Sequence, residues 1–151
     1  MLAVIRIRGN IKVKPALRKT MELLRLHRTN HLVLVSEEQL PMVKKVQSFV
    51  TWGEPEEATI AKMLEKRARL PGNKKIDAGF LKKHSLGTFE NFAKDILEGK
   101  KTLAEAGIKP VFRLKPPKKG FERQGIKKPY SIGGALGYRA ADINYLIAKM
   151  V

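Results

Sequence analysis

The amino-acid sequence predicts an α+β protein with a β-α-β-α-β core at residues 1–53 and an α-rich C-terminal extension at 54–151. Strand-like and helix-like patterns alternate as far as residue 53, and helical periodicity dominates from Pro55. Within the extension, five glycines and three prolines interrupt residues 112–139, which excludes a long regular element there. We expect this irregular basic ribbon, a last helix and the core to pack together as one unit.

Each element of the core follows from a local pattern. Apolar and polar residues alternate over 1–9, which predicts a strand, and a second strand is predicted over 31–35. Pro15 suits the first turn of a helix over 15–27. The sequence SEEQ at 36–39 resembles a capping box before a helix over 42–50, although Pro41 can delay it. Thr51 and Trp52 complete the core as a short third strand.

The extension is predicted to be mostly helical. Acidic residues in the first turn and basic residues in the last favour a helix over 56–70. Asp77 and Thr88 are candidate caps for helices over 78–83 and 89–99, and TLAE at 102–105 is a second capping-box pattern. A short strand is predicted over 111–114, and apolar residues at helical spacing predict a final helix over 140–150.

The charge of the chain indicates a polyanionic partner. Its 31 Lys and Arg outnumber 14 Asp and Glu, which gives a net charge of +17. Residues 1–53 and 111–151 each contribute +7. Self-repulsion of this size favours neutralisation by nucleic acid or an acidic membrane surface. The sequence has no apolar run of ~18 residues that would span a membrane, no signal pattern and no cysteine. We therefore expect a cytoplasmic protein without membrane contact.

Basic residues near the N-terminus form the first candidate binding surface. Arg6 and Arg8 share one face of the predicted strand, so both reach solvent or a ligand if helices cover the other face. A solvated edge strand with protective charges is the alternative. Further cations follow closely, which makes phosphate binding the better interpretation. The candidates here are Arg6, Arg8, Lys12, Lys14, Arg18, Lys19, Arg25 and Arg28.

The ribbon is the second candidate, because aromatic residues are interleaved with its basic residues. Aromatic rings stack on bases or ribose while cations meet phosphates. Disorder is the alternative for so charged a segment. We expect the ribbon to become ordered on RNA, since it cannot bury itself. Its candidate contacts are Arg113, Lys115, Lys118, Lys119, Arg123, Lys127, Lys128, Tyr130, Tyr138 and Arg139.

Signals of catalysis and cofactor binding are weak. His27 and His31 have i,i+4 spacing but straddle a helix end and a strand, and no HExxH motif surrounds them. The glycines of GGALG at 133–137 follow no phosphate-loop pattern. We predict no enzyme activity, no cofactor and no metal. A small nucleic-acid-processing enzyme would need clustered carboxylates, whereas the acids here are dispersed over 54–110.

The order and spacing of several motifs resemble those of a known family, large-subunit ribosomal protein L thirty, whose eukaryotic counterpart is called L seven. The short bacterial form resembles residues 1–53, through IRIRG, KPALRKTMELLRL and MVKKVQSFV. The longer archaeal and eukaryotic form resembles the rest, through WGEP, FRLKPPKKG and GGALGYRAADINYLIAKM. The chain opens almost directly on its first strand, without the long basic extension of eukaryotic members, which favours the archaeal type.

The resemblance implies a ferredoxin-like core and a structural, non-catalytic role in the large ribosomal subunit. Its partners would be 23S-type rRNA, other large-subunit proteins and, in the neighbourhood, 5S rRNA, with no homo-oligomer expected. By matching position, the first strand and helix (Arg6, Arg8, Lys14, Arg18 and Lys19) and the ribbon become the expected contacts. A freestanding RNA-binding or RNA-chaperone protein is the alternative function, because it would carry the same charge.

Overall fold

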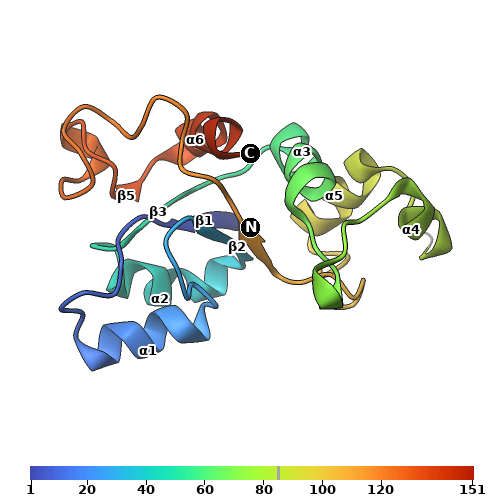
Figure 1. The fold of residues 1–151 in the computed structure, drawn as a ribbon, viewed down its shortest axis with the longest axis horizontal. Helices are drawn as coiled ribbons and strands as arrows, with labels where there is room; N and C mark the ends of the chain where they lie inside the picture. The colour runs from blue at the N-terminus through green and yellow to red at the C-terminus, as the bar shows by residue number, and fades with distance from the viewer. Residues whose placement is uncertain (85) are drawn as a thin grey trace.

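The computed structural model describes residues 1–84 and 86–151 and confirms the α+β, ferredoxin-like class (Figure 1). A sheet in the order β4-β2-β1-β3-β5 carries helices on both faces. The strands and helices are β1 (Leu2–Arg6), α1 (Pro15–Leu23), β2 (His31–Val35), α2 (Leu40–Lys45), β3 (Val50–Gly53), α3 (Glu57–Arg67), α4 (Ala78–Lys83), α5 (Phe89–Leu97), β4 (Val111–Arg113), β5 (Gly137–Tyr138) and α6 (Ile143–Met150).

β1 is the central strand of the sheet and is buried along its whole length. It runs antiparallel to β2 and to β3, with Val4 opposite both Val33 and Trp52. β4 pairs antiparallel with β2, and β5 pairs parallel with β3. Because successive side chains of a strand point to opposite faces, β1 contributes to two separate cores.

One core lies under α1 and α2, and the other lies under α3, α5 and α6. Val4 and Val33 pack with Met21 of α1 and Val43 of α2. On the opposite face, Ile5 belongs to a larger cluster, to which the helices of the extension contribute Ile60, Met63, Leu64, Phe92, Ile96, Ile143, Leu146 and Ile147. Figure 1 shows α1 and α2 below the sheet and α6 above it. The core and the extension therefore share apolar packing.

Several core elements are shorter than predicted. The amides of Ile7 and Arg8 both donate to the carbonyl of Phe49, at 2.9 and 3.1 Å, and this bulge-like pairing ends β1 at Arg6. α1 ends at Leu23 because Arg25 takes a left-handed conformation (φ 59°) and Leu26 N–H bonds the Met21 carbonyl. α2 stops at Lys45, so that Val50 starts β3 instead of ending a helix.

The predicted caps have mixed outcomes. Thr88 accepts a hydrogen bond from Asn91 N–H at the start of α5, as predicted. Ser36 makes no such bond and precedes a 3₁₀ turn at Glu37–Gln39, so that prediction is wrong. Thr102 and Glu105 form both bonds of a capping box, yet the segment is a turn rather than a helix. α3 ends at Arg67 because Ala68 is extended.

The expectation that the ribbon cannot bury itself is wrong. Leu114, Ala135 and Leu136 belong to the larger core cluster, and the ribbon's Gly137 and Tyr138 form β5, which the sequence did not predict. Lys115 N–H and Lys118 N–H each donate at 3.0 Å to the last carbonyls of α6, beside which the ribbon arches in Figure 1. These bonds satisfy carbonyls that a helix end leaves free.

A close backbone approach inside the ribbon explains one of its glycines. A Cβ added at Gly134 would lie 2.1 Å from the Lys128 carbonyl oxygen, so no larger residue fits without opening the loop. The amides of Gly134 and Leu136 donate to the carbonyls of Pro129 and Lys128, at 2.9 and 3.2 Å. The ribbon is thus an ordered loop with its own hydrogen bonds.

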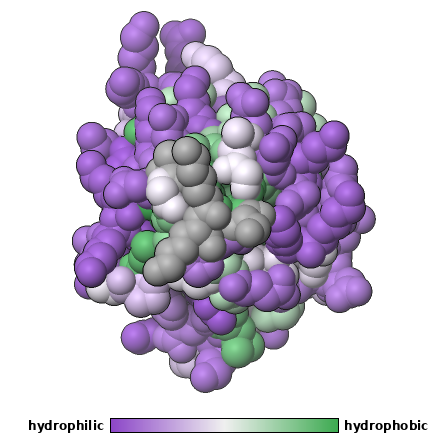
Figure 2. All heavy atoms as spheres, turned by 90° about the vertical axis from the view of Figure 1, so that its right-hand side faces the viewer, coloured by the Kyte–Doolittle hydropathy of each residue, from purple (hydrophilic) through white to green (hydrophobic). Residues whose placement is uncertain are grey.

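The face over α3, α4 and α5 is mostly hydrophilic. Figure 2 shows only small, separate hydrophobic patches on this side of the molecule. Charges of both signs are close here, as in Lys101–Asp95 (2.8 Å) and Lys100–Glu98 (2.6 Å). This region therefore has the mixed surface of an ordinary globular protein.

Candidate nucleic-acid interface

The register of the sheet brings basic residues from both halves of the chain to one end of the strands. β1 and β4 finish at this end, and β2, β3 and β5 begin there, because Arg6 pairs with Val50 and His31 pairs with Arg113. We call it the basic end. Its exposed or half-buried cations lie on β4 or in the segments that join the strands, and they are Arg8, Lys12, Lys14, Arg28, Arg113, Lys115, Lys127 and Lys128.

The opposite end of the strands, the acidic end, carries the other sign of charge. Glu37 and Glu38 follow β2, and Glu54, Glu56 and Glu57 follow β3. The amino group of Met1, at the start of β1, lies 3.3 Å from a Glu37 carboxylate oxygen. Folding therefore converts a charge excess at both ends of the sequence into a separation of charge along the strands. A polyanion is therefore attracted more strongly to the basic end than to the acidic end.

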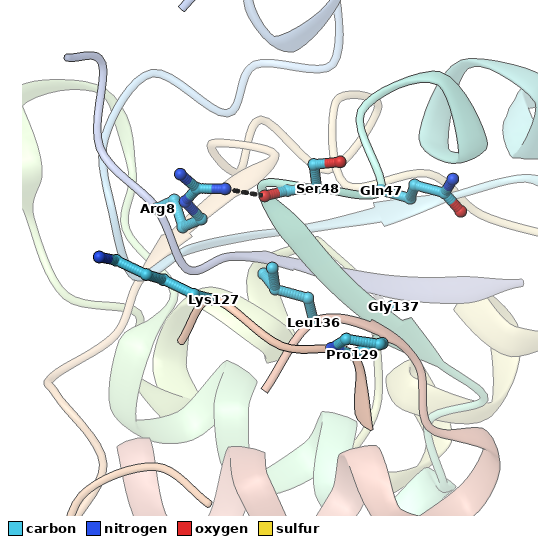
Figure 3. A pocket seen from close by; sticks show the side chains of 7 residues that line it. All are labelled: Arg8, Gln47, Ser48, Lys127, Pro129, Leu136 and Gly137. Atoms are coloured by element: carbon cyan, nitrogen blue, oxygen red, sulfur yellow. Dashed lines mark hydrogen bonds between the residues drawn. The ribbon is translucent and has the colours of Figure 1, made fainter. Parts of the chain in front are cut away.

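A groove of about 320 Å³ opens at the basic end, between the N-terminal half and the ribbon. Arg8 and Lys127 lie on one side of it, and Gln47 lies on the other (Figure 3). Arg8 donates to the Ser48 carbonyl at 3.1 Å and stacks over the Phe49 ring, 5.1 Å from its centroid. The groove thus presents two cations from segments more than 100 residues apart in sequence, backed by polar atoms.

Arg6 does not reach solvent, which corrects the expectation that it lies beside Arg8 on an open face. Its relative exposure is 2% because α1 and α2 cover that face of β1. The guanidinium donates to the carbonyls of Leu26 (2.7 Å), His27 (3.1 Å) and Arg8 (2.8 Å) and to the Asn10 side chain. Burial, and then the charge of Arg18, lower the pKa of Arg6.

Arg139 is also buried, with a relative exposure of 3%, and its charge is neutralised within the protein. Both of its terminal nitrogens donate to the carboxylate of Glu122, one of them at 2.7 Å. Its Nε donates to the Thr51 hydroxyl at 2.8 Å, and its guanidinium lies 4.4 Å from the centroid of the Tyr130 ring. The predicted exposure of Arg139 to a ligand is therefore wrong, and it ties the ribbon to β3.

The pKa of Glu122 reflects this contact. Burial alone would raise it, but the hydrogen bonds and charge of Arg139 outweigh burial and lower the pKa below its ordinary value. Glu122 is the only acidic residue between 106 and 141. A lone acid in a basic segment is the sequence signal that could have identified a buried partner for Arg139.

The remaining predicted site residues lie at or near the surface. Tyr130 is half-buried and donates to Asp142 at 2.7 Å, whereas Tyr138 is exposed and donates to Glu54 at 2.9 Å, toward the acidic end. Arg18 is exposed and lies 3.2 Å from Glu22. Arg8 is half-buried, and the cations that are exposed are Lys12, Lys14, Lys19, Arg25, Arg28, Arg113, Lys115, Lys118, Lys119, Arg123, Lys127 and Lys128.

Sequence reasoning missed three residues of the basic end, Asn10, Gln47 and Ser48, because small polar residues carry no pattern. Nearby His31 was considered only as a metal ligand. Burial, followed by the charges of His27 and Arg113, lowers the pKa of His31, so it adds no positive charge at pH 7. Within residues 1–84 and 86–151, no three His, Asp or Glu residues cluster in a way that could hold a metal ion.

No helix in the described part of the chain is both long and apolar enough to cross a bilayer.

Comparison with known proteins assigns the family. The sequence pattern of the family described as Ribosomal protein L30p/L7e matches residues 2–50. The chain is 44% identical to large ribosomal subunit protein uL30 of Nanoarchaeum equitans, over 99% of this chain and 97% of that protein. It is 46% identical to the protein of that name from Methanococcus vannielii, over 99% and 98% of the two chains, and 42% identical to the one from Thermofilum pendens, over 98% and 97%. The chain therefore belongs to the ribosomal protein L30p/L7e family.

Proposed function

We propose that this protein is a structural constituent of the large ribosomal subunit that binds 23S-type rRNA through its basic end. The observation that carries the proposal is that the basic end gathers cations from two segments far apart in sequence, such as Arg8 and Lys127, while glutamates follow the strands at the other end. Family membership supports the choice of rRNA, since the relatives are named as large-subunit proteins.

The mechanism is charge neutralisation combined with recognition of shape. The sheet fixes the spacing of the cations, and the groove between Arg8 and Lys127 offers a concave surface that fits a phosphate backbone. Most contacts of such proteins go to phosphate and sugar, so reading of base edges is not required. Arg6 and Arg139 are excluded from direct contact in this proposal, because both are buried.

The remaining features of the proposal follow from the family. The protein would act in the cytoplasm within the subunit, next to other large-subunit proteins and in the neighbourhood of 5S rRNA. It would be present as a single copy rather than as a homo-oligomer, and it would have no catalytic activity. These features are tested by crosslinking in whole ribosomes.

A matched pair of triple variants tests the basic end. The variant Arg28→Gln, Arg113→Gln and Lys127→Gln removes three exposed charges from the basic end, and Lys62→Gln, Lys66→Gln and Lys74→Gln removes three exposed charges from the extension. Both lower the net charge by the same amount. Binding to purified archaeal 23S-type rRNA is measured by filter retention over a range of salt concentrations.

We expect the basic-end variant to reduce the slope of log K against log salt by about 2 to 3, at roughly 0.7 to 0.9 per phosphate contact. The extension variant should change the slope by less than about 1. Equal losses in the two variants would show that net charge, and not the basic end, drives binding. Absence of binding by the unaltered protein, in rRNA and in reconstituted subunits, would reject the function.

A further inference from the structure

Ile11, at the tip of the loop that joins β1 to α1, is the most exposed large apolar side chain in the described part of the chain, at 89%. Single exposed apolar residues are common on protein surfaces, so exposure alone carries no inference. Two further observations support an inference: hydrogen bonds from Arg6 hold this loop in place, and cations surround its tip.

Arg6 holds in place the base of the loop that joins β1 to α1. Its buried guanidinium donates to the Arg8 carbonyl and to the Asn10 side chain, and through Leu26 and His27 it ties the loop to the turn after α1. Lys12 then takes a left-handed conformation, with φ 55°, which costs a non-glycine residue about 1 kcal/mol. A fixed loop loses little conformational entropy on binding, which favours a contact made by its tip.

The charges around the tip define the partner. Arg8, Lys12 and Lys14 flank Ile11, all three are exposed or half-buried, and no acidic residue occurs between positions 1 and 21. Cations on both sides of an apolar residue match a nucleic acid, whose phosphates alternate with ribose and base faces. Isoleucine is one of the side chains that proteins insert between base steps.

We propose that Ile11 is an apolar wedge that packs against an unstacked base or ribose of rRNA, while Lys12 and Lys14 contact the flanking phosphates and Arg6 acts as the positioning residue. This proposal rests on the function proposed above. It adds an apolar contact at a defined position, which charge neutralisation does not require.

The test separates the apolar contact from the ionic ones. Ile11→Ala should weaken binding to purified archaeal 23S-type rRNA about fivefold to tenfold, because apolar area buried at the contact is lost. It should leave the salt slope and the melting temperature nearly unchanged, since Ile11 is almost fully exposed in the free protein. Lys12→Gln should lower the slope by about 0.7 to 0.9.

Leu23→Ala is the matched control. Leu23 is 63% exposed and lines a shallow pocket with Val35 and Pro110, toward the acidic end. The same loss of exposed aliphatic surface should therefore leave rRNA affinity unchanged. An equal loss of affinity in Leu23→Ala would show that the effect is not specific to the loop tip, and would overturn the wedge.

A fluorescent variant identifies the partner. In Ile11→Trp, the indole introduced at the tip should be open to acrylamide quenching in the free protein and protected on purified rRNA. Protection only in whole subunits, and not on rRNA, would mean that the tip contacts a protein, which overturns the proposal. If the unaltered protein binds rRNA while Ile11→Ala binds equally well, the wedge is rejected and the proposed function stands.

Discussion

Two buried arginines, one on each face of the sheet, stabilise the molecule in different ways. Arg6 is surrounded by carbonyl and amide oxygens, and no carboxylate lies within ion-pair distance of it among residues 1–84 and 86–151. Arg139 meets the carboxylate of Glu122 with both terminal nitrogens. The positive charge of Arg6 therefore adds to that of the basic end, whereas the charge of Arg139 is neutralised by Glu122.

The two arginines therefore have different structural roles: Arg6 organises the basic end, and Arg139 fixes the ribbon to the sheet. Arg6 joins two loops that carry exposed cations, Arg8 and Lys12 on one side and Arg25 and Arg28 on the other. Arg139 joins the ribbon to β3 through Glu122, Thr51 and the Ala135 carbonyl. A buried arginine can thus hold a cationic surface in place or hold a segment of chain in place, depending on its partners.

The largest expected effect comes from breaking the ion pair. Arg139→Ala leaves the Glu122 carboxylate partly buried without its partner, and it should lower the free energy of unfolding by about 3 kcal/mol, as measured by urea denaturation. The control Arg123→Ala removes an exposed arginine from the same ribbon and should change stability by less than about 0.5 kcal/mol. A small effect of Arg139→Ala would mean that the ribbon does not depend on this contact.

Replacing Arg6 should have a smaller effect on stability and a distinct effect on binding. Arg6→Lys keeps the charge but cannot reproduce the forked geometry, so some of the bonded oxygens lose their donors. We expect a loss of about 2 kcal/mol in the free energy of unfolding. Affinity for rRNA should fall with the salt slope unchanged, because no phosphate contact is removed. A reduced slope would show instead that Arg6 itself contacts phosphate.

The smallest expected effect is a loss of stability at acidic pH. Because the folded-state pKa of Glu122 is depressed, its ion pair contributes stability that is fully present above the unfolded pKa and is lost as pH falls through the folded pKa. The protein should therefore lose stability below about pH 4.5, the ordinary value for glutamate. Glu122→Gln should be less stable at pH 7 and should show a weaker dependence on acid. The contacts of Arg6 should show no such dependence on pH, because Arg6 has no carboxylate partner among the residues that the structure describes.

Much of the fold could be predicted because local patterns determine it. The alternation around Val4 and Ile5 places β1 correctly, Thr88 marks the start of α5, and the apolar spacing from Ile143 to Met150 gives α6. Boundaries were less predictable where one pattern fits two structures. Val46, Phe49 and Val50 have helical spacing, yet Val50 starts β3, because pairing with Arg6 of β1 outweighs continuation of the helix.

The candidate interface was predicted in composition but not in arrangement. The sequence shows that the cations concentrate in two zones, but only the strand register shows that both zones reach one end of the sheet. The burial of Arg6 could not be predicted, because it depends on helices distant in sequence, whereas the lone acid Glu122 was an unused signal for the burial of Arg139. β5 has only two residues, and its pairing with Thr51 and Trp52 leaves no local pattern.

The arrangement of opposite charges at the two ends of the strands gives the molecule a permanent electric dipole along β1. In the field of a polyanion, such a dipole exerts a torque that turns the protein before any atoms touch. A larger fraction of its collisions then occurs with the groove between Arg8 and Lys127 facing the polyanion. Association is therefore accelerated, and most strongly at low ionic strength, where the field is least screened.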